Sequence, residues 1–244
     1  MDLLIPLNES RRRMEMYPAY YFTDSPDKYY YGIIIYTTLC TIFAMSVFVA
    51  SDTILIYSVQ HVCGLLALAG SRFKYSLDSL YSLTDDTKVD NERLYKNVCD
   101  AINSHKRAFA YLTEIESAYA INLFVQVGVV IISFTITLFQ AATVSFNMET
   151  YHYFGFAISQ FVHIFFLTVQ GQFVINLQDS IYIKTYETCW YRGNVKTQAL
   201  FVMIQRRNLT PPQLTAGGLI ELNLDTFAEV VKVCVSYCTV LRST

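Results

Sequence analysis

The stretch that decides the fold is residues 118–148, AYAINLFVQVGVVIISFTITLFQAATVSFNM, which contains no charged residue. Residues 150–178 form a second charge-free block, and residues 29–71 form a third block whose only formal charge is Asp52. A helix needs roughly 20 apolar residues to cross the hydrocarbon core of a bilayer, and each block is at least that long. A helix on a soluble protein would carry charged residues along its outer face. The blocks therefore indicate an integral membrane protein.

The composition of the whole chain excludes several other classes of protein. Of 244 residues 53% are hydrophobic and 16% charged, with a formal net charge of −2. These values exclude a disordered chain and a nucleic-acid binder with a basic face. The six cysteines include no CxxC pair and no histidine pair has metal-ligand spacing, so we expect no metal or other cofactor. No nucleophile elbow or glycine-rich phosphate loop occurs either, and we predict that the chain is not an enzyme.

The distribution of lysine and arginine predicts the orientation of the blocks in the membrane. Seven of these residues fall in 61–117 and five in 184–211, but none falls in 29–60 or 118–183. The positive-inside rule therefore places 61–117 and 184–211 in the cytoplasm. Residues 1–28 would then be extracellular, although they contain no apolar core that could serve as a signal peptide. We therefore expect that an odd number of preceding spans is missing from this sequence.

The predicted fold class is all-α, a polytopic membrane helical bundle with four transmembrane helices and cytoplasmic helical extensions. The glycosylation sequon at Asn8 agrees with an extracellular start. In order, the predicted segments are an extracellular loop (1–28), a helix running inward (29–73), a cytoplasmic loop and helix (74–117), a helix running outward (118–148), a helix running inward (150–183), a cytoplasmic region (184–211) and a last helix running outward (212–244).

The last predicted helix carries a stripe of carboxylates. Thr-Pro-Pro at 210–212 predicts the helix start, and the helix would then run over 214–241. Glu221, Asp225 and Glu229 are spaced four apart, which places them on one helical face. Each charge would cost on the order of 2.5 kcal/mol or more in lipid, so the stripe must meet water, a partner helix or an aqueous pathway. Two interpretations remain open: an interfacial amphipathic segment, or a cation-attracting vestibule closed by an apolar ring.

Several short motifs are spread over nearly the whole chain. The C-terminal motifs are the most specific: PQLTAGG at 212–218, LNLDTF at 222–227 and SYCTVLRS at 236–243. The others, in chain order, are PLNES at 6–10, Tyr21-Phe22 with Asp24, Asp52-Thr53, Gln60-His61 with Cys63-Gly64, and Trp190-Tyr191. Together, and in this order, the motifs resemble those of insect odorant receptors, with an outer-loop pattern similar to the hymenopteran receptors.

The resemblance implies a subunit of an odorant-gated, non-selective cation channel with seven helices, its N-terminus inside the cell and its C-terminus outside. The four predicted spans would be helices 4–7, so three spans would precede them. Residues 184–211 would belong to the family's cytoplasmic anchor region. The subunit would assemble into a hetero-tetramer with a shared odorant co-receptor, in the plasma membrane of olfactory sensory neurons.

The resemblance also implies roles for individual residues. The last helix would line the pore, with the family's gate valine at Val240; Arg242 departs from the family, which commonly has an uncharged residue there, and reduced cation entry would follow. The pore and gate candidates are Val240, Tyr237, Ser236, Glu229, Asp225 and Glu221. The candidates for an apolar, aromatic odorant pocket are Ile34, Thr37, Thr38, Thr41, Met45, Tyr153, Phe156, Gln160 and His163. The alternative for these side chains is ordinary bundle packing and, for His163, an intramembrane hydrogen bond.

Three other interpretations of the function stay open at this point. A gustatory receptor of the same superfamily would share the tyrosine-containing end of the last helix, although the outer loop and residues 212–218 favour the olfactory branch. The second interpretation is a membrane protein of a different class, either a G-protein-coupled receptor or a multipass transporter. A G-protein-coupled receptor would place its C-terminus inside the cell, which topology mapping distinguishes. A truncated chain with no activity is the third interpretation.

Overall fold

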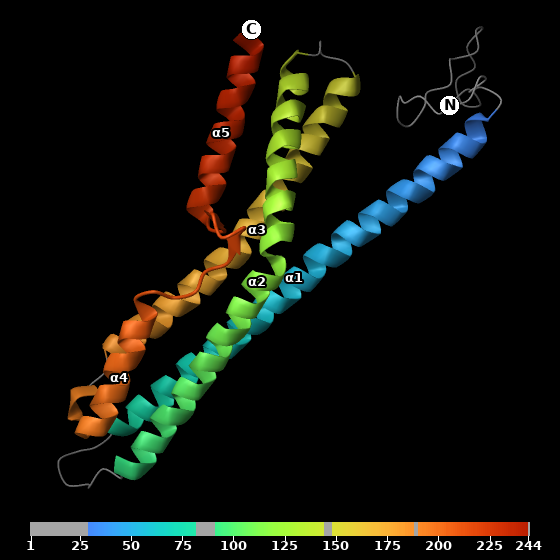
Figure 1. Ribbon diagram of the computed structural model, residues 1–244. Coiled ribbons are helices and arrows are strands. Elements are labelled where there is room, and N and C mark those ends of the chain that lie inside the picture. The colour runs from blue at the N-terminus through green and yellow to red at the C-terminus, as the bar shows by residue number, and fades with distance from the viewer. Residues whose placement is uncertain (1–28, 82–90, 144–147, 188–189, 244) are drawn as a thin grey trace. The chain divides into compact units, whose positions relative to one another are not determined.

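The structure, a computed structural model, describes residues 29–81, 91–143, 148–187 and 190–243 and is mostly helical, as predicted. The long helices are α1 (Tyr30–Tyr81), α2 (Asn91–Thr143) and α3 (Met148–Tyr186). A 3-10 turn η1 (Trp190–Arg192), a short helix α4 (Val195–Asn208) and a last helix α5 (Leu224–Ser243) follow (Figure 1). Strands β1 (Thr215–Ala216) and β2 (Ile220–Glu221) pair antiparallel. The predicted loop 1–28 and the sequon at Asn8 lie outside the described residues.

Three of the described helices are long and apolar enough to cross a membrane, over Tyr30–Ser76, Glu92–Thr143 and Tyr151–Tyr186. They expose large apolar side chains such as Phe43, Ile121 and Phe156, which suits contact with lipid rather than water. The 53 residues of α2 measure about 80 Å, far more than the ~30 Å of hydrocarbon. The bilayer therefore accommodates only part of α2, and the charge-free part after Glu116 suits it.

Internal contacts divide the chain after Ile54 into two units. The first contains the beginning of α1. The second contains α1 from Leu55 onward with all later elements, and its core includes Leu66, Leu112, Leu123 and Val174. Within it α4 packs beside the N-terminal half of α2, and α5 packs beside the C-terminal half of the same helix (Figure 1). The helix α1 continues past its predicted end at residue 73 to Tyr81, and Phe73 and Ser76 are buried in this unit.

The short helix α4 begins at an asparagine cap. The Oδ1 atom of Asn194 accepts hydrogen bonds from the backbone N–H of Thr197 (2.8 Å) and from its hydroxyl (2.7 Å). An asparagine in this place satisfies a donor that the first helical turn leaves unpaired. From this cap α4 runs to Asn208.

Replacing this cap is expected to have a modest, specific effect. Asn194→Ala should lower the free energy of unfolding by about 1 kcal/mol, whereas Asn194→Asp should retain most of it because the acceptor oxygen remains. Thermal unfolding of the detergent-solubilised chain, followed by the fluorescence of its single tryptophan, Trp190, measures the difference. Equal losses in the two variants would contradict the capping role.

The C-terminal segment differs from the single helix predicted over 214–241. Gly217 and Gly218 adopt positive φ angles of 66° and 69° and form the turn between β1 and β2, a conformation that ends any helix there. The helix α5 begins only at Leu224, where Oδ1 of Asn223 caps it by accepting from the N–H of Thr226 (2.8 Å). The predicted helix start at 210–212 is therefore wrong. The placement of Glu221 on the helical face is also wrong, because this residue lies in β2.

Candidate functional site

The hairpin before α5 is held by both α2 and α3. The N–H of Gly217 donates to the carbonyl of Ala120 on α2 (2.9 Å), and the hydroxyl of Thr215 donates to Oε1 of Glu116 (2.6 Å). On the other side, the backbone of Leu222 approaches Gly171 of α3 so closely that a Cβ atom at residue 171 would lie 1.8 Å from the carbonyl oxygen. Only glycine permits this approach. These contacts fix where α5 begins.

Two glutamines of α3 hold the backbone on either side of the hairpin. The Nε2 atom of Gln178 donates to the carbonyl of Pro212 (2.9 Å), and Oε1 of Gln172 accepts from the N–H of Leu224 (3.3 Å). The Pro212 carbonyl precedes the hairpin and the Leu224 N–H belongs to the first turn of α5, so both bonds satisfy backbone groups that their own segments leave unpaired. The sequence gives no sign of the role of Gly171, since glycine is ordinary in an apolar helix of this kind.

One face of α5 packs against the C-terminal half of α2 and the N-terminal half of α3. Val230 and Cys234 are buried there together with Val130 and Phe134 of α2 and Ile164 of α3. The ring of Phe227, one turn earlier, lies between two rings of α3, 5.1 Å from that of Phe161 and 5.5 Å from that of Phe165. The spacing of these α5 residues is that of one helical stripe, so α5 is amphipathic in its packing.

The opposite face of α5 is exposed. It carries Asp225, Glu229, Lys232, Ser236 and Val240, which recur every three or four residues and are all exposed. Tyr237 is exposed as well (61%), and no element within the described part of the second unit covers this face. Five of the predicted pore and gate residues therefore lie exposed on one helix. Glu221, the sixth, is exposed on β2 and accepts a hydrogen bond from Nδ2 of Asn223 (3.3 Å).

The predicted odorant-pocket residues fall into two groups in different units. The first group lies on α1 within the first unit: Ile34, Thr37, Thr38, Thr41 and Met45. Hydroxyls in this group bond to the carbonyls of their own helix, as Thr37 does to that of Ile33 (2.9 Å). The second group lies on α3 in the second unit: Tyr153, Phe156, Gln160 and His163. A pocket shared by both groups stays a prediction.

Polar side chains link the apolar parts of the helices. Nε2 of Gln160 donates to Oγ of Ser133 on α2 (2.9 Å), and the Nε2 atoms of Gln126 and His163 lie 3.3 Å apart. A similar bond joins Gln60 of α1 to Gln170 of α3 (2.8 Å). Such contacts pair groups that would be costly to leave alone in an apolar environment. They support the interpretation of His163 as an interhelical hydrogen-bonding residue.

Comparison with known proteins identifies the family. The family model described as 7tm Odorant receptor matches residues 3–235. The chain belongs to this odorant receptor family. Its fold is similar to that of the olfactory receptor OR5 of Machilis hrabei, solved in complex with eugenol, with a TM-score of 0.73 and 18% sequence identity over 93% of this chain. The similarity predicted from the C-terminal motifs is thereby confirmed.

The relatives are longer than this odorant receptor chain. The match to OR5 covers 55% of that receptor, so the chain spans about half its length. Odorant receptor 49a of Drosophila melanogaster is 24% identical over 99 residues, which are 41% of this chain and 25% of that protein. The family and its apolar helices make this chain a membrane receptor.

Proposed function

We propose that this chain is a subunit of an odorant-gated, non-selective cation channel, and that α5 lines the pore. The observation that carries the proposal is the exposed face of α5, which places Asp225, Glu229 and Lys232 in line with Ser236 and Val240. A charged stripe of this kind is costly against lipid but suits a water-filled path. An apolar residue near the far end of the same face, Val240, supplies the ring that closes the path by excluding water.

The length of α5 supports its role as a fourth span. Its 20 residues measure about 30 Å, which equals the hydrocarbon thickness of a typical bilayer. In this arrangement the basic regions of the second unit face the cytoplasm, and α5 runs outward to an extracellular C-terminus. The helices α1, α2, α3 and α5 then correspond to helices 4–7 of the receptor fold. The receptor acts in the plasma membrane of olfactory sensory neurons as a hetero-tetramer with a co-receptor of the same family.

The proposed ligand is a volatile odorant. The solved relative binds eugenol, a small molecule, and the side chains of the proposed pocket are mainly apolar or aromatic. Odorant binding in the outer half of the bundle would open the pore, and no chemical step is catalysed. The three pore residues at the end of α5, Ser236, Tyr237 and Val240, lie nearest to this outer half.

The pore assignment predicts opposite effects for the charges on α5. The chain replaces the matched part of the Machilis receptor in a chimera, which is expressed with a co-receptor in oocytes and screened with eugenol. Glu229→Gln should reduce single-channel cation conductance about two- to threefold, because one charge at ~7 Å in water changes the local cation energy by about RT. Lys232→Gln should raise conductance for the same reason. Unchanged conductance in both variants would exclude this face from the pore.

The gate assignment has a separate test. Val240→Ala should raise the current that flows without odorant, because a smaller apolar ring is easier to hydrate. Val235→Ala is the matched control, since Val235 is exposed on another side of the same helix. Similar basal currents in the two variants, at equal surface expression, would contradict a gate at Val240.

A further inference from the structure

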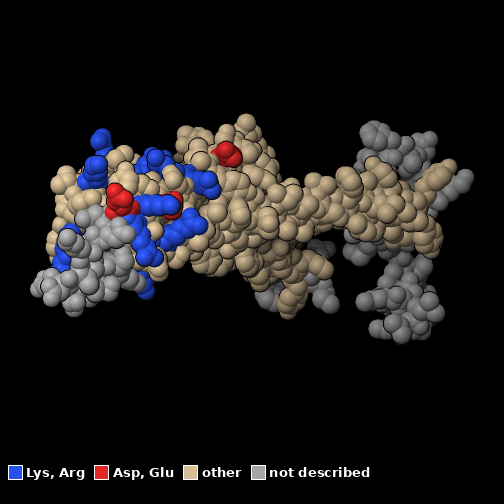
Figure 2. Space-filling model, turned by 90° about the horizontal axis from the view of Figure 1, so that it is seen from below, with Lys and Arg blue, Asp and Glu red and all other residues tan. Residues whose placement is uncertain are grey.

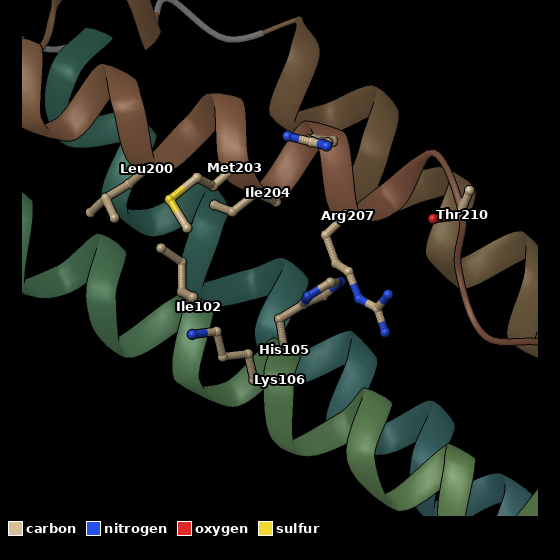
Figure 3. A pocket seen from close by; sticks show the side chains of 9 residues that line it. Ile102, His105, Lys106, Leu200, Met203, Ile204, Arg207 and Thr210 are labelled. Atoms are coloured by element: carbon tan, nitrogen blue, oxygen red, sulfur yellow. The ribbon is translucent and has the colours of Figure 1, made fainter.

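A basic pocket lies between α2 and α4, far from α5. Its volume is about 470 Å³ (Figure 3). One part of its wall is apolar and the other is cationic, and the described residues that line it include no Asp or Glu. The apolar part is Ile102, Leu200, Met203 and Ile204, and the polar part is His105, Lys106, Arg206, Arg207 and Thr210.

A buried histidine forms part of the pocket wall. His105 is 97% buried, and its Nε2 atom has no hydrogen-bond partner among the described residues. Lys106 and Arg207 flank it (Figure 3). The guanidinium of Arg207 is held in place over the ring of Phe109, with 5.4 Å between its Cζ atom and the ring centroid. The pocket wall therefore holds fixed positive charge beside a buried, neutral side chain.

The charge state of His105 fits this environment. His105 itself lies in the charged part of α2, before the charge-free stretch that suits the bilayer. Burial, followed by the positive charge of Arg207, lowers the pKa of His105 to about 4, against a smaller opposing effect of Asn208. The imidazole is neutral at pH 7, so the positive charge around the pocket belongs to the lysine and arginine side chains.

The distance between the pocket and the membrane-spanning part of α2 favours a soluble ligand over a lipid. About 20 Å of helix separates His105 from Ala118, where the charge-free stretch begins. Even at a tilt of 40° this leaves about 15 Å, which exceeds the ~5–8 Å of headgroup region on one side of a bilayer. A bound headgroup would have to leave its own leaflet to reach the arginines. Other Lys and Arg side chains gather at the same end of the second unit (Figure 2), which draws soluble anions toward it.

We propose that this pocket binds a soluble organic phosphate of about nucleotide size. The phosphate lies among Lys106, Arg206 and Arg207, because guanidinium and ammonium groups form charge-assisted hydrogen bonds to phosphate oxygens. The planar or apolar body of the ligand lies on the wall made by Ile102, Leu200 and Met203. The access of this ligand from the cytoplasm rests on the orientation proposed above, but the binding itself does not.

A binding assay with a fluorescent nucleotide tests the proposal. The purified chain is held in phosphatidylcholine nanodiscs and titrated with the mant derivative of ATP. Saturable binding is expected, with competition by ATP and none by adenosine. The double variant Lys106→Gln/Arg206→Gln should weaken binding by roughly a hundredfold, since each lost charged hydrogen bond contributes about tenfold or more to the affinity. Met203→Trp, which fills the pocket at an exposed position, should weaken binding with every charge retained.

Matched controls make the outcomes distinct. Lys196→Gln removes a charge from α4 outside the pocket and should leave the affinity unchanged. Absence of binding, or equal binding in the wild type, the double variant and the Met203→Trp variant, would overturn the proposal. If binding is seen only with vesicles that contain anionic lipid, the ligand is a lipid headgroup, and the proposal of a soluble phosphate would be overturned. No current is measured, so failure of the channel proposal would leave this result unaffected.

Discussion

Gly171→Ala is expected to destabilise the second unit by about 3 kcal/mol, at the upper end of the range for an overpacked site. The added Cβ would lie 1.8 Å from the carbonyl oxygen and 2.9 Å from the carbonyl carbon of Leu222. The obstacle is backbone, so no rotation of a side chain can relieve it. The hairpin or α3 must therefore move, and the contacts that fix the start of α5 must weaken with them.

The measurement is thermal unfolding of the detergent-solubilised chain. A loss of 3 kcal/mol corresponds to a fall of roughly 6–12 °C in midpoint for a domain of this size. The control is Gly155→Ala, which makes the same change on the same helix at a position with no atom within 4 Å of the added Cβ. That variant should lose no stability. Similar midpoints in the two variants would show that the close approach of α3 and Leu222 does not occur.

Phe201→Ala is expected to have the largest effect of any change within α4, a loss of about 3–5 kcal/mol. The Phe201 side chain is completely buried and belongs to the same core as Val98 and Phe109 of α2. Truncation removes its apolar contact area and leaves a cavity that the long helices around it cannot easily close. Because the lost contact is the one that holds α4 against α2, α4 should separate from α2 at a lower temperature than that at which the rest of the unit unfolds.

Two readouts distinguish this from a general loss of folding. Trp190 packs against the same core just before α4, so its fluorescence should report the separation directly. Val202→Ala is the control, since Val202 is 52% exposed and its truncation should cost less than about 0.5 kcal/mol. Weakening of mant-ATP binding should accompany Phe201→Ala and not Val202→Ala. Equal stability of the two variants would exclude Phe201 as the main anchor of α4.

The long helices and the family could be predicted from the sequence because both depend on local information. The absence of charge over 118–148 and 150–178 is a property of the chain itself, and it suffices to predict apolar helices of spanning length. The carboxylate spacing of Asp225 and Glu229 likewise fixed one helical face, since positions four apart meet on any α-helix. The C-terminal motifs likewise indicated the family, because each is a short continuous stretch of sequence.

The hairpin, the start of α5 and the basic pocket depended on tertiary structure. Residues 214–222 could continue a helix by their apolar content, but Gly217 accepts a left-handed conformation and bonds to Ala120 of a distant helix. The role of Gly171 exists only where Leu222 meets it, and Lys106 joins Arg206 only once α4 packs on α2. Hydropathy and spacing describe a residue by its chain neighbours. A close backbone approach or a shared cavity is set by residues that folding brings together from different helices.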